Sequence, residues 1–256
     1  QTGDLTFENG GRENGMTIGI ASKSVSWDCN FIDIDLDGDL DLWFGSGNIN
    51  PYVTYSPNTI YLNDGDGNFL QATGSDSQLF SPIGKTMGSI WADFDKDGDL
   101  DAIISQSNTG VHYFENNAAD NNDKNWIGID VWQRQKNYSA KTIANGAIVD
   151  IYFSNDKSVR QVVKIGSGYA GTKDTTIQLG IPEGETITKI QIKWKDGTVI
   201  EYQDLELNQY HNLEHIIELD NQNDSATTQE DTYLLTLWVF LIIFLVVFVR
   251  LFTRKG

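Results

Sequence analysis

Two acidic loops constrain the fold more than any other feature of this 256-residue chain. The first, DIDLDGDLD, spans Asp33–Asp41, and the second, DFDKDGDLD, spans Asp93–Asp101. Each has aspartate at positions 1, 3, 5, 7 and 9 and glycine at position 6. Alternating apolar residues flank the loops, as in Leu40, Leu42 and Phe44, and this pattern indicates strands rather than helices on either side. The chain is therefore expected to contain a strand-based unit that occurs twice.

Five carboxylates in nine residues repel one another unless a hard cation lies between them. Carboxylates at positions 1, 3 and 5, the glycine and a carbonyl at position 7 match the start of an EF-hand loop. An EF-hand loop needs glutamate at its twelfth position, but the two loops have Phe44 and Ile104 there, which excludes an EF-hand. Position 9 is therefore expected to supply the last carboxylate. Two solvated acidic turns are the alternative, but the same run occurs twice in matching context. Magnesium fits less well because it retains its waters. We expect two calcium ions, one held by Asp33, Asp35, Asp37, Asp41 and the Asp39 carbonyl, the other by Asp93, Asp95, Asp97, Asp101 and the Asp99 carbonyl.

A second repeated motif follows each loop. It reads TIYLNDGDGNF at Thr59–Phe69 and VHYFENN at Val111–Asn117. Together with the loops, this motif resembles the FG-GAP/VCBS repeats, which are the calcium-loop blades of integrin-type β-propellers. The resemblance implies a partial propeller of two blades. Two blades cannot close a ring, so we expect exposed sheet edges that a partner covers.

The charge distribution suggests a domain boundary. The chain has 36 acidic and 18 basic side chains, and its net charge of −18 argues against a nucleic acid partner. Most of the acidic excess precedes Asn125, whereas the following residues are of mixed charge. We therefore divide the chain into a repeat region, 1–124, and a second region, 125–217.

The second region is expected to be a β-sandwich. Five short apolar runs lie between turn residues, and Lys195–Thr198 has the Asp-Gly pair of a type I′ hairpin. The region resembles the ASPIC/UnbV domain, and the pairing of both modules is similar to the cartilage acidic protein family. Ala170–Thr172 departs from the Ser-Gln that this family has after its Gly-Ser-Gly-Tyr. The runs are residues 148–153, 158–165, 175–179, 188–194 and 198–202, and the stretches that carry the resemblance are residues 125–127, 145–147, 166–169 and 190–197.

The C-terminal segment has the character of a membrane anchor. Residues 233–249 carry no charge, which predicts a transmembrane helix over 232–252 in contact with the lipid bilayer. Basic residues follow it, so the tail at 253–256 is expected in the cytoplasm and the large domains in the extracellular or periplasmic space. Residues 218–231 are polar and predict a flexible stalk. The chain starts with Gln1, consistent with removal of a signal peptide.

These features favour a non-enzymatic, calcium-binding scaffold, an accessory subunit that binds other membrane-complex subunits or extracytoplasmic proteins. The single cysteine, Cys29, rules out an internal disulfide. One alternative is a lectin-like module that binds glycans through exposed aromatics such as Trp43, Tyr52 and Tyr55. A remote alternative is a zinc hydrolase that uses the H-x-x-E-H motif, with residues His211, Glu214 and His215.

Overall fold

The computed structural model describes residues 13–15, 25–47, 57–72, 85–107, 109–119, 124–166 and 172–218. Every regular element in these ranges is a β-strand, which confirms the all-β prediction. Residues 1–134 and 140–215 form one compact unit, which contains the repeat region and most of the second region. The other unit comprises residues 135–139 and 216–256, and within its described part Lys136 N donates to Ile217 O at 2.9 Å.

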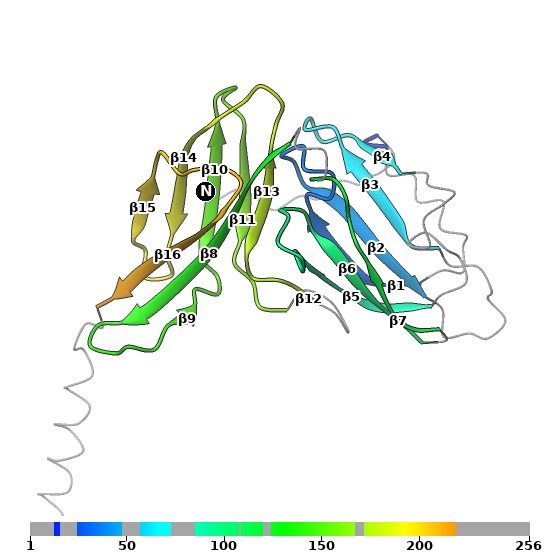
Figure 1. Cartoon of the computed structure of the whole chain (residues 1–256), viewed down its shortest axis with the longest axis horizontal. Coiled ribbons are helices and arrows are strands. Elements are labelled where there is room, and N and C mark those ends of the chain that lie inside the picture. The colour runs from blue at the N-terminus through cyan, green and yellow to red at the C-terminus, as the bar shows by residue number, and fades with distance from the viewer. Residues whose placement is uncertain are drawn as a thin grey trace, which may run out of the picture. The chain divides into compact units, whose positions relative to one another are not determined.

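The repeat region forms two sheets, each with an acidic loop between consecutive antiparallel strands (Figure 1). The first sheet has the order β1-β2-β3-β4, and the second has the order β12-β5-β6-β7. Four strands in a sheet is the size of a propeller blade. The loops therefore join strands, as expected. The strands of the repeat region are β1 (Val25–Ile32), β2 (Asp41–Gly47), β3 (Thr59–Asn63), β4 (Phe69–Gln71), β5 (Thr86–Ala92), β6 (Asp101–Gln106) and β7 (Gly110–Phe114).

One strand of the second sheet comes from the second region. β12 (Thr172–Lys173) lies parallel to β5, with Thr172 opposite Ile90 and Lys173 opposite Trp91 (Figure 1). A further backbone bond joins Asp174 N to Trp91 O at 2.8 Å. The expectation of open blade edges is therefore only partly correct, because the second region pairs with one of them.

Two tryptophans form the centre of the repeat-region core. Trp43 and Trp91 are 0% and 1% exposed, and their rings meet edge to face with centroids 5.3 Å apart. Both indole N–H groups donate to buried polar side chains. Trp43 is thus a core residue, which removes it from the candidate glycan-binding aromatics. The other two candidates, Tyr52 and Tyr55, lie outside the described residues.

The second region consists of two sheets that share one hydrophobic core. Their orders are β13-β8-β16, with β9 paired to β8, and β11-β10-β14-β15. Buried apolar residues from both sheets form a single cluster. The described residues thus form four small sheets, similar to propeller blades in strand number. The strands are β8 (Asn125–Gln135), β9 (Thr142–Ile143), β10 (Ile148–Phe153), β11 (Ser158–Val162), β13 (Ile177–Ile181), β14 (Ile187–Lys193), β15 (Val199–Tyr202) and β16 (Tyr210–Ile217).

The described part of the chain contains no helix that is both long and apolar enough to cross a membrane. The helix expected at 232–252 and the tail at 253–256 lie outside the described residues, as does the stalk except for Glu218.

Candidate calcium centre

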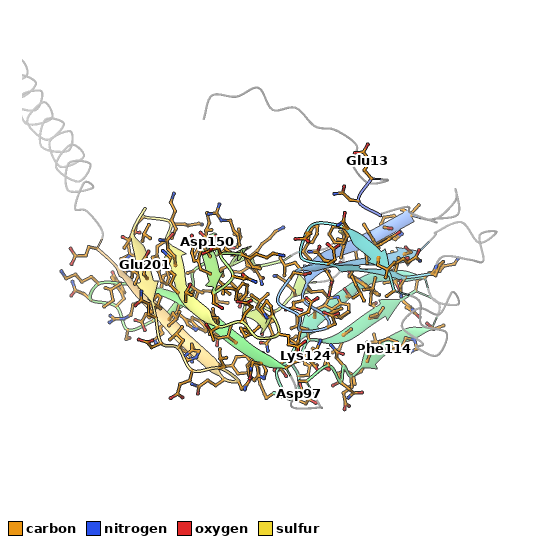
Figure 2. The ribbon with its side chains drawn as sticks, turned by 90° about the horizontal axis from the view of Figure 1, so that it is seen from above. Glu13, Asp97, Phe114, Lys124, Asp150 and Glu201 are labelled. Atoms are coloured by element: carbon orange, nitrogen blue, oxygen red, sulfur yellow. The ribbon has the colours of Figure 1, made fainter. Side chains whose placement is uncertain are left out.

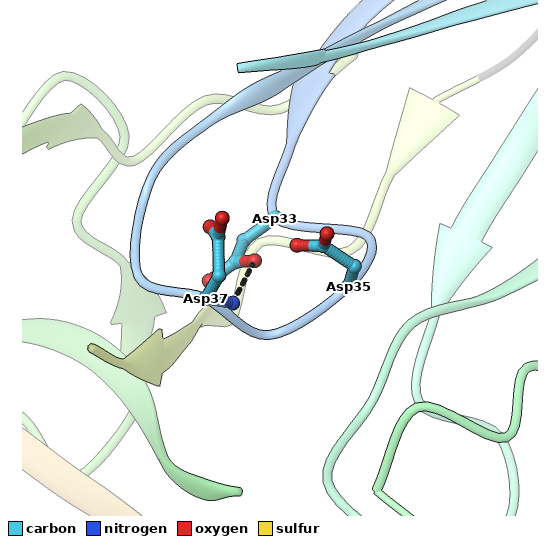
Figure 3. A group of neighbouring side chains, drawn as sticks. All are labelled: Asp33, Asp35 and Asp37. Carbon is cyan, nitrogen blue, oxygen red and sulfur yellow. Dashed lines mark hydrogen bonds between the residues drawn. The ribbon is translucent and has the colours of Figure 1, made fainter. Parts of the chain in front are cut away.

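The first acidic loop folds around its first aspartate. Leu36 and Gly38 adopt positive φ angles of 56° and 91°, which turn the chain sharply and direct backbone N–H groups inward. Asp37 N donates to Asp33 Oδ1 at 3.1 Å (Figure 3). Gly38 N donates to Asp33 Oδ2 at the same distance. The glycine at position 6 therefore adopts the left-handed conformation that the predicted sharp turn requires.

Three carboxylates of this loop come together. Single oxygens of Asp33, Asp35 and Asp37 all lie within 4.8 Å of one another (Figure 3). Burial and the charge of Asp35 raise the pKa of Asp37 above its usual value. Asp33 is fully buried, and desolvation raises its pKa strongly despite its backbone hydrogen bonds. This grouping of like charges is favourable with a cation or with bound protons.

The second loop repeats this geometry around Asp93. Lys96 and Gly98 have φ angles of 70° and 111°. Lys96 N donates to Asp93 Oδ1 at 2.6 Å, and Gly98 N donates to Asp93 Oδ2 at 2.9 Å. The carboxylates that gather here are Asp93, Asp95 and Asp101. Asp97, which was expected as a ligand, is not in this group, although burial and the neighbouring aspartates raise its pKa.

The ninth aspartate of each loop is bound to the backbone of the next hairpin. Both oxygens of Asp41 accept backbone bonds of 2.9 Å, from Ile34 N and Asn63 N. Asp101 accepts in the same way from Phe94 N at 3.1 Å and Asn116 N at 2.8 Å. The structure groups Asp101 with two other carboxylates and does not group Asp41 in this way. Both residues close their loops through these backbone bonds, and the ligand role of Asp41 stays a prediction.

The seventh aspartates were expected to contribute only their carbonyls, yet their side chains are also enclosed. Asp99 is 0% exposed; its Oδ2 accepts from Ala119 N at 2.9 Å, and its Oδ1 has no partner among the described residues. Asp39 Oδ1 and Asp35 Oδ1 are also buried and without a hydrogen-bond partner in the described part. Buried carboxylate oxygens without donors fit a bound hard cation. This donor set is therefore suited to calcium.

Both loops also contact the second region. Gly180 N, in β13, donates to Asp33 Oδ2 at 2.7 Å. The Tyr210 hydroxyl, in β16, donates to Asp93 Oδ2. Lys124, the last residue of the repeat region, is labelled in Figure 2, and its Nζ donates to the Asp35 carbonyl in the first loop. The first aspartate of each loop thus accepts one hydrogen bond from a strand of the second region.

Close packing accompanies these hydrogen bonds. A Cβ atom at Gly180 would meet the backbone of Leu36, and one at Gly38 would meet the ring of Pro182. Gly98 lies equally close to the indole of Trp126. These glycines let the backbone of each acidic loop lie directly against the second region.

Sequence reasoning missed the second-region partners of the loops. Gly180 and Tyr210 lie outside the repeated motif, so neither carries a local signal. Asn63 and Asn116, by contrast, belong to the motif that follows each loop. These two asparagines are equivalent in the structure, because each donates its backbone N–H to the ninth aspartate of its loop. The sequence alignment of Thr59–Phe69 with Val111–Asn117 does not pair them and is offset by one residue from this structural equivalence.

The H-x-x-E-H motif lies on β16 rather than on a helix. Residues 211 and 215 share one face of the strand, and residue 214 faces the other way. His211 Nε2 lies 2.8 Å from a backbone carbonyl, His215 Nε2 lies 2.7 Å from Asp196 Oδ2, and Glu214 pairs with Arg134 and a lysine. The three side chains therefore do not converge on a zinc site.

Comparison with known proteins identifies both regions. Residues 33–104 match the FG-GAP-like repeat, and residues 137–219 match the ASPIC and UnbV domain. The chain is 27% identical over 173 residues to cartilage acidic protein 1 of Homo sapiens, covering 66% of this chain and 24% of that protein. The mouse (Mus musculus) protein of the same name is 26% identical over 173 residues, covering 66% and 25%. The chain thus spans about a quarter of the length of these relatives. The chain therefore contains a segment that matches an FG-GAP-like repeat, followed by one that matches an ASPIC and UnbV domain, and it is similar to cartilage acidic protein 1.

Proposed function

We propose that the chain is a non-enzymatic, extracytoplasmic interaction module in which two calcium ions hold the FG-GAP-like repeat against the ASPIC and UnbV domain. The observation that carries this proposal is the double role of the acidic loops. Each loop gathers three carboxylates, and its first aspartate also accepts a hydrogen bond from the second region. An ion in the loop therefore orders the residue that bridges the two regions.

The carboxylates that gather in each loop would hold the ions. Calcium supplies a double positive charge and accepts six to eight oxygen ligands in flexible geometry. It would offset the repulsion among the aspartates and give a partner to buried oxygens such as Asp99 Oδ1. The proposed ligands are Asp33, Asp35 and Asp37 for the first ion, and Asp93, Asp95 and Asp101 for the second, with carbonyls such as those of Asp39 and Asp99.

Two further observations support an interaction role rather than catalysis. The matched domains are of non-catalytic type, and the H-x-x-E-H side chains each bind elsewhere. The outer strands of the blades carry exposed apolar side chains, including Leu70 in β4 at 75% and Val111 in β7 at 69%. Exposed apolar residues on sheet edges are typical of surfaces that a partner protein covers. Subunits of a membrane complex or other extracytoplasmic proteins are the proposed partners.

The proposed location is a membrane, with residues 232–252 as a single span and the large domains outside the cytoplasm. The uncharged run before the basic tail supports this orientation. Protease added to right-side-out vesicles should digest the large domains and spare a C-terminal tag. Loss of the tag with survival of the domains would reverse the orientation.

A metal assay tests the calcium proposal. Protein purified in calcium should retain two ions, and Asp35→Asn and Asp95→Asn should each retain one. Asp66→Asn, outside the loops, is the matched control and should retain both. Each ion adds about 2.7 kcal/mol at a hundredfold excess over Kd, so chelation should lower the Tm by at least ~5 °C. Protein that retains no calcium and has the same Tm with chelator would overturn the proposal.

A further inference from the structure

A cleft between β1 and β11 has a charge opposite to that of the chain. Its volume is about 300 Å³, and three of its lining residues are basic, namely Arg160, Lys164 and Lys173. None of its described lining residues carries a carboxylate, although the whole chain has 36 acidic side chains against 18 basic ones. A neighbouring cleft of about 360 Å³ is lined by Asp37 and Asp39, among other residues. The two clefts therefore differ in the charge of their lining residues.

The two lysines of this cleft have different environments. Lys173 lies in β12, and burial together with the charge of Lys164 lowers its pKa. Lys164 is exposed at the cleft, and no ion pair is found for it among the described residues. Two ammonium groups that repel one another are stabilised by an anion placed between them.

A buried amide in the same cleft has an unused donor. Gln161 is 6% exposed, and its Oε1 accepts from Lys173 Nζ at 3.1 Å. Because an ammonium group only donates, the amide oxygen must face Lys173, which fixes the amide orientation. Gln161 Nε2 is then a buried donor without a hydrogen-bond partner in the described part of the chain. Such a group is costly to bury and indicates an acceptor that occupies the cleft.

The remaining walls narrow the choice of ligand. Arg160 binds both oxygens of Asp150, at 2.6 and 2.9 Å, so most of its charge is already compensated. Phe31, 53% exposed, and Leu40 give the cleft an apolar side. The cleft therefore combines donors and positive charge at one side with an apolar surface at the other, as small-molecule sites do.

We propose that this cleft binds a small organic anion. Lys164, Lys173 and Gln161 Nε2 bind its oxyanion group, a carboxylate or a sulfate. The body of the ligand lies against Phe31 and Leu40. The proposal stands apart from the calcium proposal, because the three polar groups that bind the oxyanion lie outside both acidic loops, and the first loop contributes only the apolar side chain of Leu40.

Calorimetric titrations of the full chain, at constant ionic strength and saturating calcium, test this proposal. Glucuronate and benzoate are the acid probes, and glucose and benzamide are their neutral counterparts. At least one acid should bind while its neutral counterpart does not. Glucuronate alone would indicate an acidic sugar as the source of the anion, and benzoate alone an aromatic acid. Binding of neither acid, or equal binding of an acid and its neutral counterpart, would overturn the proposal.

Charge-reversal variants locate the binding. Lys164→Glu should weaken binding of the acid at least about tenfold, the effect of one charge-assisted hydrogen bond. Lys193→Glu, an exposed lysine outside the cleft, changes the net charge equally and should leave the affinity within about twofold. Gln161→Glu places a carboxylate beside Lys173 and should abolish binding without lowering the Tm. Equal weakening by Lys164→Glu and Lys193→Glu would show general charge attraction and contradict a specific site.

Discussion

The two regions of the molecule are stabilised in different ways. Among the residues that the structure describes, the ASPIC and UnbV region has sixteen buried residues in one apolar cluster, and the cluster of the repeat region has seven. The repeat region instead buries loop carboxylates such as Asp33 and Asp99, each 0% exposed. Apolar burial stabilises the ASPIC and UnbV region without any bound ligand. The buried carboxylates of the repeat region are stable only when a cation, protons or hydrogen bonds compensate their charge. Removal of calcium should therefore destabilise the repeat region and its contacts with the second region, and should affect the core of the second region much less.

The variant that tests this contrast most strongly is Asp33→Ala. It removes the acceptor for the N–H groups of Asp37, Gly38 and Gly180, so the free energy of unfolding should fall by about 3 kcal/mol. Urea denaturation in saturating calcium measures the loss. Asp66→Ala, which breaks only an exposed ion pair, should change the value by less than about 0.5 kcal/mol. Similar losses in both variants would remove the distinction between loop and surface acids.

Gly180→Ala tests the contact from the side of the second region. The new Cβ would meet the backbone of Leu36 and separate β13 from the first loop. We expect a loss of about 1–3 kcal/mol in unfolding free energy and weaker calcium binding at the first loop only. The second loop serves as an internal control in the calcium titration. An unchanged isotherm at the first loop would mean that its ion does not depend on β13.

Tyr210→Phe is the gentler change at the second loop. It removes the hydroxyl that donates to Asp93 and keeps the ring against Trp126. The expected loss is about 1 kcal/mol, with reduced calcium affinity at the second loop. Tyr202→Phe removes a hydroxyl in β15, away from the loops, and should leave both calcium sites intact. If both variants bind calcium alike, the Tyr210 hydroxyl does not position Asp93.

The smallest effect concerns pH. Burial raises the pKa of Asp41 to about 7 and those of Asp39 and Asp99 to about 6. Because these folded-state values exceed those of the unfolded chain, the calcium-free protein should gain stability as pH falls from about 8 towards 4. The calcium-loaded protein should lose stability over the same range, since protons compete with the ion. Thermal melts with and without calcium measure both slopes, and slopes of equal sign would contradict this account.

Local pattern was enough to predict most strands and both loop turns. The run at 148–153 coincides with β10, and a hairpin forms at the Asp-Gly pair, with Trp194 N donating to Thr198 O at 2.8 Å. The predicted type I′ turn is wrong, because that turn needs positive φ at both of its central residues, and Gly197 has one (88°) whereas Asp196 does not. These features depend on neighbouring residues alone. The structure brings together three of the predicted ligands in each loop, and the ligand roles of Asp41 and Asp97 stay predictions.

Long-range contacts were not predictable from the same pattern. The pairing of β12 with β5 and the bond from Gly180 to Asp33 join residues far apart in the chain. The sequence of β16 gives only a weak strand signal, because its residues do not alternate cleanly between apolar and polar. In the structure most of its side chains are half-buried. The docking of the acidic loops onto the second region thus became visible only in three dimensions.

Amide hydrogen exchange, with and without chelator, tests the central claim most directly. In calcium, the N–H groups that donate to the first aspartates, including those of Gly180 and Gly98, should be protected. Removing calcium should accelerate their exchange, while the core amides of Ile151 and Ile190 in the second region keep their protection. This result would place the calcium dependence at the junction of the two regions. Exchange that is unchanged at Gly180 and Gly98 after calcium removal would contradict the claim that calcium holds them together.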